Sequence, residues 1–513
     1  MRRRFLIIPF LFTFASLLQL NYIASIVVSP DQILRPLVVL WLLLGLLIWP
    51  AYWLTHDWNW TALLLTIFTV GFSSSASFFS VVLTFTVIVG VCWLAFIRLR
   101  RMKISLIHFM YILAGTSVFF TVYAVFLEST MLTRIPWTDY KRSAYDARNY
   151  SLETLSSPSI KPDIYYVVVD GYARADILQE MFKFDNSEFI TDLQEEGFVV
   201  PAFSHSNYPA TPLSIASTLN MDYIQALAPA LDKNPHRWLM APFIDHSRVR
   251  ALLESQGYKT ISISTNWTIT DNVTTDVYLH PFPVMLTDFE GFVLDLTPLQ
   301  LFEPILGSFA SLPNAESHRE VIRYNFKSLT DLANVPGPKF VFAHIISPHP
   351  PFVFDRDGKP VDSQSSFTFQ DANEFPGSSK EYPRRYVEQV QFVNHNLEKM
   401  IGAILAQSSI PPVIILQADH GSGMLTDLTS PENTCIRERF SPFAAYYLPD
   451  LESGAIPPDI SPVNLFRIIF DEYFDAQLPL LENRQYFYKG MQTYYDFEDV
   501  TPRLNDQCVV PIR

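Results

Sequence analysis

Cysteine is scarce in this sequence, which has three among its 513 residues. So few cysteines exclude a fold that is held together mainly by disulfide bonds. Cys92 lies in an apolar run, whereas Cys435 and Cys508 lie in the polar part of the chain. These two can pair if that part of the chain is exported, and they are free thiols if it is not.

The sequence also lacks an excess of positive charge, since its formal net charge is −14 at pH 7. Nucleic-acid binding needs a basic face, so we expect no nucleic-acid partner. The charge is unevenly distributed, because residues 1–135 are apolar and basic and the remainder is acidic. This distribution is typical of a membrane anchor joined to a soluble domain.

Long apolar runs fill the first quarter of the chain. A helix needs about 20 apolar residues to span a bilayer. The sequence predicts five such helices, the third being the shortest: Phe5–Val28, Ile33–Leu54, Trp60–Phe72, Phe78–Ile97 and Ile104–Leu127. They contain no array of charges that would indicate a pump or channel.

Basic residues predict how these helices are oriented. One cluster, Arg2 to Arg4, precedes the first span, and a second, between Arg98 and Lys103, separates the last two. With five spans both clusters face the cytoplasm, as the positive-inside rule requires. We therefore expect an integral protein of the cytoplasmic membrane. Its N-terminus is cytoplasmic and its polar domain is periplasmic or extracellular.

The polar part alternates strand and helix patterns from Lys161 onward. Apolar, β-branched runs such as Ile164–Val169 and Val413–Leu416 predict buried strands, and longer amphipathic stretches such as Tyr386–Leu405 predict helices. Such alternation indicates an α/β domain with a mostly parallel sheet covered by helices. We predict transmembrane helices over 1–127, a juxtamembrane linker over 128–160 and the α/β domain over 161–513.

Three buried strands end in side chains that can bind a metal. Asp170 follows the first of them, the pair Asp419 and His420 follows the strand at Val413, and His349 follows a run that begins at Lys339. Ligands bind at the carboxyl ends of strands in open α/β sheets. Carboxylates and imidazoles are common ligands of divalent metals. The sequence therefore predicts one shared site at one edge of the sheet.

Thr211 precedes Pro212 and a helical run, and two roles are open for it. Proline suits the first position of a helix, which makes Thr211 a candidate N-cap. The same position favours phosphate or sulfate binding, because the helix dipole and the free backbone amides attract anions. A hydroxyl that binds a cation there can lose its proton and act as a nucleophile.

In this order, the motifs resemble those of the sulfatase-like branch of the alkaline phosphatase superfamily. The whole layout resembles lipoteichoic acid synthases and lipid A phosphoethanolamine transferases, which are five-span membrane proteins with an external catalytic domain. The resemblance is carried by Val-Asp-Gly-Tyr, Thr-Pro-Leu-Ser-Ile, Ser-Pro-His-Pro-Pro-Phe and Ala-Asp-His-Gly. It implies an N-terminal five-helix transmembrane domain followed by a sulfatase-like α/β domain.

The resemblance also implies roles for individual residues. One divalent metal is expected on Asp170, Thr211, Asp419 and His420, with Thr211 as the nucleophile and His349 in contact with the substrate phosphate. This donor set favours Zn²⁺ or Mn²⁺ and also admits Mg²⁺.

The sequence departs from the family pattern in two places. Sulfatases need a Cys or Ser in a Cys/Ser-x-Pro-x-Arg string to make formylglycine, and the string at Thr211 lacks both the precursor and the arginine. No histidine follows His420, so we expect a single metal. The phosphoethanolamine enzymes also place a substrate-binding histidine after this pair, so its absence leaves open whether the head group is phosphoethanolamine. Arg437 and Arg439 can supply the missing positive charge, since Arg suits phosphate oxygens. Alternatively, they pair with surface carboxylates.

The residues together predict a membrane-anchored, metal-dependent phosphotransferase. Thr211 would attack a phospholipid head group or another phosphodiester and transfer a substituted phosphate to a cell-envelope acceptor. The expected partners are therefore a lipid or glycan phosphate substrate. The alternatives are a phosphate or sulfate ester hydrolase with the same residues, and a non-catalytic membrane scaffold that kept the fold.

Overall fold

The computed structural model describes the chain over residues 6–24, 30–73, 146, 155–158, 160–231, 234–281, 286, 289–290, 293, 314–361, 369–375, 380–452 and 454–508. The chain divides into two compact units. One consists of Met1–Arg134 and Pro283–Leu312, and the other of Ile135–Phe282 and Pro313–Arg513.

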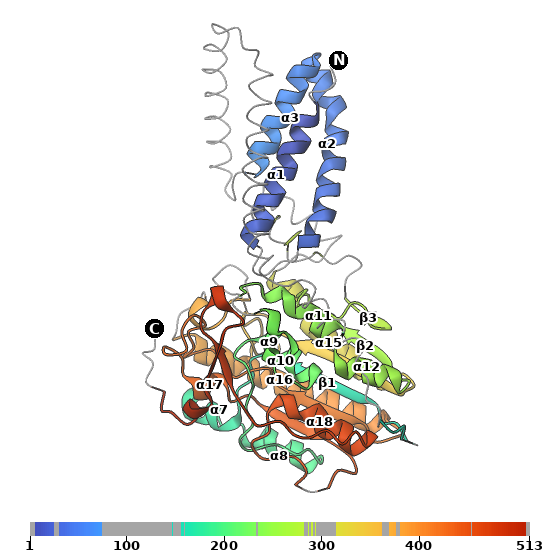
Figure 1. The fold of residues 1–513 in the computed structure, drawn as a ribbon, viewed down its shortest axis with the longest axis vertical. Helices are drawn as coiled ribbons and strands as arrows, with labels where there is room; N and C mark the ends of the chain where they lie inside the picture. Colours follow the sequence, from blue (N-terminus) through green and yellow to red (C-terminus); the bar gives the residue numbers. More distant parts are fainter. Residues whose placement is uncertain are drawn as a thin grey trace. The chain divides into compact units, whose positions relative to one another are not determined.

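The first unit contains three helices that pack on one another, α1 (Ile7–Ala24), α2 (Leu34–Thr55) and α3 (Trp58–Ser73), as Figure 1 shows. They coincide with the first three predicted spans. Of the described helices, α2 is the one that is long and apolar enough to cross a membrane. The spans predicted over Phe78–Ile97 and Ile104–Leu127, and most of the linker predicted over 128–160, lie outside the described residues.

Two side chains from the segment Pro283–Leu312 pack on these helices. Phe289 and Val293 are buried against Leu17, Ile33 and Leu37. Glu290, which directly follows Phe289, forms an ion pair with Arg35 at the start of α2. The chain that follows the strand Val277–Leu279 therefore contributes to the helical unit.

The second unit is built on a six-stranded sheet with the order β3-β2-β4-β1-β5-β6. Its strands are β1 (Ile164–Val169), β2 (Lys259–Ile263), β3 (Val277–Leu279), β4 (Lys339–Ile345), β5 (Val413–Gln417) and β6 (Ala444–Tyr447). All neighbouring strands are parallel except β5 and β6. The predicted α/β domain with a mostly parallel sheet is confirmed.

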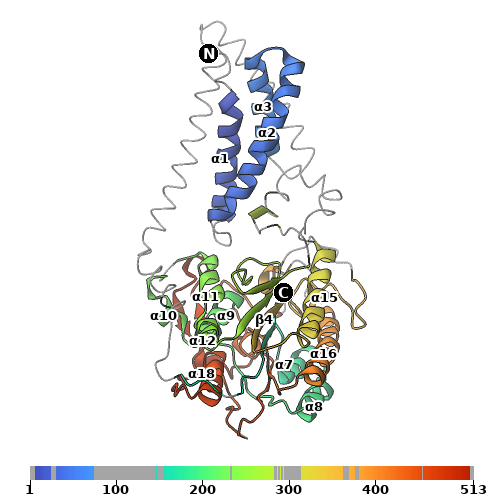
Figure 2. The same cartoon turned by 90° about the vertical axis from the view of Figure 1, so that its right-hand side faces the viewer.

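Every residue of the three central strands, β1, β4 and β5, is buried. These strands are nearly continuous apolar runs because helices cover both faces of the sheet. Figure 2 shows α9, α10, α11, α12 and α18 on one face and α7, α8, α15 and α16 on the other.

The helices vary widely in length. Their bounds are α7 (Ala175–Phe182), α8 (Ser187–Glu195), α9 (Thr211–Asn220), α10 (Ile224–Leu227), α11 (Ala241–Asp245), α12 (Arg248–Ser255), α15 (Ala315–Leu332), α16 (Tyr382–Gln407), α17 (Ile436–Arg439) and α18 (Pro462–Phe474). The large core beneath α15 and α16 is apolar and includes Val167, Leu329 and Leu397.

The C-terminal part adds a hairpin of two short strands, β7 (Tyr486–Tyr488) and β8 (Phe497–Asp499). After the hairpin the chain returns to α17, where Cys508 forms a disulfide with Cys435. The sequence left open whether these cysteines form a disulfide or are free thiols, and in the structure they form the disulfide.

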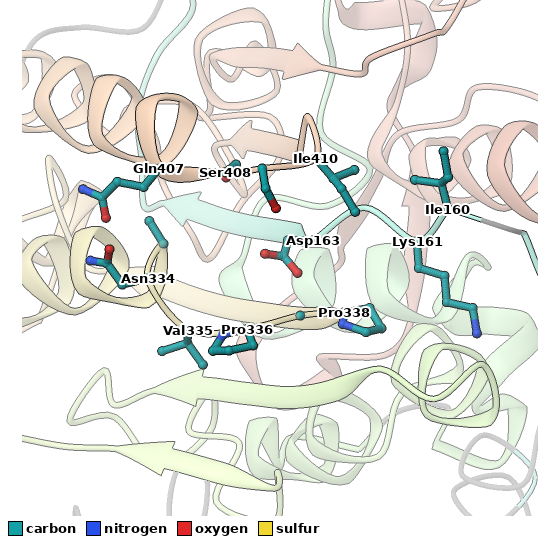
Figure 3. A pocket seen from close by; sticks show the side chains of 13 residues that line it. Ile160, Lys161, Asp163, Asn334, Val335, Pro336, Pro338, Gln407, Ser408 and Ile410 are labelled. Atoms are coloured by element: carbon teal, nitrogen blue, oxygen red, sulfur yellow. The ribbon is translucent and has the colours of Figure 1, made fainter.

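A cavity of about 690 Å³ lies at the amino ends of β1, β4 and β5. Figure 3 shows Asp163, Pro338 and Ile410, which come just before or near the starts of these strands, around it. None of the predicted site residues lines this cavity. The ligand-bearing side chains come instead from the opposite, carboxyl ends of the same strands.

Candidate metal centre and active site

The carboxyl ends of the three central strands bring four side chains together. Strand β1 lies between β4 and β5, with Val168 paired to His344 on one side and to Gln417 on the other. Asp170 therefore emerges between His344 of β4 and the Asp419–His420 pair that follows β5. Convergence at one sheet edge follows directly from the parallel strand order.

The imidazole of His420 lies at the centre of this group. Its Nδ1 lies 2.9 Å from the carbonyl oxygen of Gly421, which can only accept a hydrogen bond, so Nδ1 carries the proton. The lone pair on Nε2 faces Asp419 Oδ2 at 3.2 Å and Asp170 Oδ1 at 3.6 Å. His420 is thus oriented as a metal ligand through Nε2.

Thr211 reaches the same atom from the first turn of α9. Its Oγ1 lies 3.3 Å from His420 Nε2. The N-cap position of α9 belongs to Ala210, and within the described part of the chain no side-chain hydrogen bond caps this end of the helix. The N-cap role considered for Thr211 is therefore wrong by one residue, and its hydroxyl is turned toward His420.

His344 lies inside a strand, a position that the sequence interprets as a packed histidine or one that supports a metal ligand, and its imidazole contacts Asp170. It is buried in β4, with Nε2 3.2 Å from Asp170 Oδ2 and Nδ1 3.0 Å from Thr270 Oγ1. Asp170, His344 and Asp419 each offer a ligand atom within 4.8 Å of the others. The sequence signal for a role of His344 at the site is weak, because a histidine within an apolar strand is more often a buried core residue.

The donor set fits a divalent cation. Asp170 Oδ1 and Asp419 Oδ2 are buried and have no hydrogen-bond partner among the residues that the structure describes, a costly arrangement unless a cation neutralises them. Ligands at about 2.0–2.2 Å from a tetrahedral Zn²⁺ stand roughly 3.3–3.6 Å apart. The separations around His420 Nε2, from 3.2 to 3.6 Å, are close to this range.

The charges in the site favour the protonation states that metal binding needs. Burial alone would raise the pKa of Asp170, but the nearby rings of His349, His344 and His420 outweigh it and lower this pKa. Burial and the positive charge of Arg439 lower the pKa of His420. An ionised carboxylate and a neutral imidazole are the forms that coordinate a metal.

His349 lies beside this centre in the loop after β4. Its backbone N–H donates to Asp170 O at 3.0 Å, and its Nδ1 donates to Pro350 O at 2.5 Å. Its Nε2 is therefore the free nitrogen, and it lies 3.9 Å from Asp371 Oδ2. Burial lowers the pKa of His349, but the carboxylates of Asp170 and Asp371 outweigh burial and raise it.

The two arginines that the sequence suggested for substrate binding have different surroundings. Arg439 is buried, and its NH2 nitrogen lies 3.1 Å from His420 Nε2. Arg437 is partly exposed and pairs with Glu180 at 2.6 Å and with Asp176 at 3.6 Å. The structure thus brings Arg439, and not Arg437, to the other candidate residues.

His205, a loop histidine close to Thr211 in sequence, is bound to the backbone. Its N–H donates to Ile460 O at 3.2 Å, and its Nδ1 lies 3.4 Å from Phe440 O. Burial and the charge of Arg174 lower the pKa of His205 to about 4. A neutral, backbone-bound ring here favours a structural role.

Two glycines after the Asp419–His420 pair let neighbouring chain segments approach closely. A Cβ on Gly421 would lie 2.0 Å from the backbone oxygen of Glu438, and one on Gly423 would lie 2.3 Å from Asp371 Oδ2. Backbone at Glu438 cannot move aside without shifting α17. These glycines therefore fix the spacing between His420, α17 and Asp371.

The clash at Gly421 gives a stability prediction. We expect Gly421→Ala to lower the free energy of unfolding by at least about 1–3 kcal/mol, the range for overpacked interiors. The matched control is Gly402→Ala, five residues before the end of α16, where, outside the helix's own backbone, the described residues have no atom within 4 Å of the added Cβ. It should be neutral or stabilising by roughly 0.5–1 kcal/mol. Equal denaturation midpoints for both variants would contradict the close packing of this loop.

The arrangement combines an alcohol, two carboxylates, neutral imidazoles and a buried arginine around one point. Such a site can hold a divalent cation, bind an anion and attack it with a hydroxyl group. This combination, at the carboxyl edge of an α/β sheet, defines the class of metal-dependent enzymes that act on phosphate or sulfate esters.

The family follows from the sequence match. Residues 162–469 match the Sulfatase family, so the chain belongs to the sulfatase family. It is an enzyme of this sulfatase-like family, whose members are metal-dependent. The suspected membership of the sulfatase-like branch of the alkaline phosphatase superfamily is confirmed.

Two solved structures illustrate what this chain is similar to. The C-terminal periplasmic domain of EcEptC from Escherichia coli is 13% identical, with a TM-score of 0.45, and the match covers 70% of this chain and 100% of that one. The integral membrane lipooligosaccharide phosphoethanolamine transferase A of Neisseria meningitidis is 13% identical, with a TM-score of 0.41 and coverage of 81% and 75%. No curated protein matches the sequence.

Proposed function

We propose that this protein is a membrane-anchored phosphotransferase in which Thr211 is the nucleophile. Its donor would be a phospholipid head group or another phosphodiester, and its acceptor a hydroxyl group of the cell envelope. The observation that carries the proposal is the position of Thr211 Oγ1, 3.3 Å from His420 Nε2. Starting a helix does not require a threonine hydroxyl to face a metal-ligating histidine.

The proposed metal ligands are Asp170, Thr211, Asp419 and His420. A divalent ion bound there, with Zn²⁺ or Mn²⁺ favoured and Mg²⁺ admitted, supplies Lewis acidity and lowers the pKa of the threonine hydroxyl. The unpartnered oxygens of both aspartates support this set. His344 would support the centre by hydrogen bonding to Asp170, because residues that hydrogen-bond to metal ligands commonly fix the orientation of those ligands.

The transfer would occur in two displacements. Thr211 Oγ1 gives its proton to solvent and attacks the phosphorus, while the bond from phosphorus to the leaving alcohol breaks. The leaving oxygen takes a proton from His349 Nε2, and a phosphothreonine diester remains. An acceptor hydroxyl then gives its proton to His349 and attacks the phosphorus, while the bond from phosphorus to Thr211 Oγ1 breaks. This oxygen regains a proton from solvent, which restores the starting state.

The proton donor gives a pH prediction. Because nearby carboxylates raise the pKa of His349 above its usual 6.5, the protonated donor persists above pH 6.5. It is lost as the pH rises through the raised value. We expect kcat/KM for the first displacement to fall on this basic limb. His349→Gln should remove the limb and slow turnover by about 10²–10⁴-fold, the usual contribution of a general acid. A basic limb that persists unchanged in His349→Gln would exclude His349 as the donor.

A membrane anchor is supported by the surface of α2. Its large apolar side chains are exposed, among them Trp49 at 68%, Trp53 at 73% and Leu46 at 74%. In a soluble protein the core would bury such side chains, whereas in a membrane helix lipid covers them.

We propose the transmembrane part over 1–127, the linker over 128–160 and the catalytic domain over 161–513. The disulfide between Cys435 and Cys508 supports a domain outside the cytoplasm, since disulfides persist in oxidising compartments.

The proposed topology predicts where a tag is accessible. An epitope inserted after Glu128 of the full-length protein should be labelled from outside in intact cells, because five spans place it opposite the N-terminus. An epitope at the N-terminus, the matched control, should be labelled only after permeabilisation. Labelling of the Glu128 tag only after permeabilisation would contradict the extracytoplasmic assignment.

The donor and acceptor can be tested together by lipid analysis. Cells that contain the wild-type protein should lose a phospholipid and gain its diacylglycerol, together with a new phosphate-modified lipid or glycan. Cells with Thr211→Ala should match cells without the protein. Release of a free phosphate ester in place of a modified acceptor would show that water is the acceptor, which is the hydrolase alternative. Identical lipids in all three strains would contradict the proposed donor class.

A further inference from the structure

The buried carboxylate of Asp371 is not accounted for by the metal centre or by the nucleophile. It lies in the loop 369–375, just before the short 3₁₀ helix Ala372–Glu374, and its side chain is almost fully buried. A buried carboxylate requires a compensating charge or hydrogen bonds. Its partners therefore indicate what it does.

Apart from a hydrogen bond from the Ala372 backbone, the partners of the Asp371 carboxylate come from other segments around the site. Tyr382 donates its O–H to Oδ1 at 2.9 Å, and Arg439 donates from NH1 to Oδ2 at 3.0 Å. His349 Nε2 lies 3.9 Å from the same Oδ2. One carboxylate thus stands between the arginine and the histidine that would bind the substrate phosphate and protonate the leaving group.

Arg439 is held in place on every side. Nε donates to Pro209 O at 2.7 Å, Nη1 donates to Asp371 Oδ2 at 3.0 Å, and Nη2 donates to His420 Nε2 at 3.1 Å. Pro209 lies two residues before Thr211. The guanidinium therefore spans from the loop before the nucleophile to the metal-ligating imidazole, with one end directed at the reaction centre.

The surrounding chain leaves no space for Asp371 to move away. A Cβ at Gly423 would lie 2.3 Å from its Oδ2, and the N–H of Gly423 donates to the Tyr382 hydroxyl at 3.2 Å. The Gly-Ser-Gly turn after His420 thus closes over the carboxylate. Its position is fixed by packing as well as by charge.

We propose that Asp371 is a positioning residue that fixes Arg439, and with it His349, to form an anion subsite beside the metal centre. The inference rests on the proposed function and adds a residue that the sequence analysis missed. The ligand of this subsite is a tetrahedral oxyanion, such as the phosphate of the donor. Asp371 acts through Arg439 and does not itself touch the substrate.

The test is a double-mutant cycle on binding of inorganic phosphate to the full-length, Zn²⁺-loaded protein. Affinity is measured by calorimetry for the wild type, Asp371→Asn, Arg439→Lys and the double variant. We expect each single change to weaken binding by about 10-fold, the effect of a hydrogen bond between charged groups. The double variant should bind like Arg439→Lys, because coupled residues are not additive.

Two measurements separate positioning from a general loss of structure. The Zn²⁺ content should stay at the wild-type level in all variants. Asp427→Asn removes another buried carboxylate, one that caps the backbone at Thr429, and should leave phosphate affinity unchanged. If Asp371→Asn does not fold, Tyr382→Phe keeps the charge and removes the hydrogen bond that Tyr382 donates to Asp371, together with the one that it accepts from the Gly423 N–H. It should weaken phosphate binding about threefold.

The outcomes are distinct. Multiplicative effects in the cycle, unchanged affinity in Asp371→Asn or Tyr382→Phe, or no phosphate binding by the wild type would overturn the inference. Turnover of a phospholipid donor is measured separately on the wild type. Phosphate binding that follows the expected pattern without such turnover would leave the anion subsite standing and contradict the proposed function.

Discussion

Thr211→Ala is expected to abolish turnover, with a loss of at least about 10⁴-fold, because covalent catalysis cannot proceed without its nucleophile. The fold should survive the change. The hydroxyl of Thr211 makes no N-cap hydrogen bond, so the roughly 0.5–2 kcal/mol that a lost cap costs does not apply. The measurement is a steady-state assay with a phospholipid donor, together with a thermal denaturation curve.

Thr218→Ala is the matched control, because it makes the same change in the same helix. The hydroxyl of Thr218 donates to Ser214 O at 2.8 Å and also forms a hydrogen bond with the Tyr166 hydroxyl. This variant should lose at most about 1–3 kcal/mol of stability, the contribution of two hydrogen bonds, and keep its turnover. Normal turnover in Thr211→Ala would refute the nucleophile assignment.

Asp419→Ala is expected to remove both the metal and the activity. Its Oδ2 is an unpartnered buried oxygen that faces His420, and its Oδ1 accepts from the N–H of Gly171 at 3.1 Å. The change therefore deletes a metal ligand and also frees the turn after Asp170. The metal content after dialysis should fall from about one ion per chain to near zero.

Metal-dependent stability gives a second measure of the same change. A ligand that binds only the folded state raises its stability by about 2.7 kcal/mol at 100 times the dissociation constant. Added Zn²⁺ should therefore raise the melting temperature of the wild type and not that of Asp419→Ala. The control Asp427→Ala should still bind the metal. Full metal content in Asp419→Ala would show that the ligand set is wrong.

The sheet could be predicted because its central strands are long and uniformly apolar. The bounds predicted for β1 are those observed, and β5 differs by one residue, since buried parallel strands contrast sharply with the prolines and glycines around them. The edge strand β3 (Val277–Leu279) was missed. It has three half-buried residues, too few to show any periodicity.

The site could be predicted where its residues follow strands. Parallel strands deliver their ends to one edge, so Asp170, Asp419 and His420 meet without any knowledge of loop structure. Asp371 could not be found in this way. It comes from a loop of mixed polar sequence, and its role depends on Arg439, Tyr382 and Gly423, which only the tertiary structure brings to it.

The N-cap assignment failed for a local reason. Pro212 does stand in the first turn of α9, as predicted, but the helix begins at Thr211 and the extended residue before it is Ala210. Sequence rules locate a helix end to within about one or two residues. One residue is enough to turn the threonine hydroxyl from the helix backbone to His420.

Intact-mass spectrometry of the Zn²⁺-loaded protein, quenched soon after mixing with a phospholipid donor, tests the central claim most directly. The proposed mechanism predicts an added mass equal to the substituted phosphate of the donor, located on the peptide that contains Thr211. Thr211→Ala should show no adduct, and Thr218→Ala should show the wild-type adduct. An adduct on another residue, or turnover of the donor with no adduct under any quench time, would contradict transfer through Thr211.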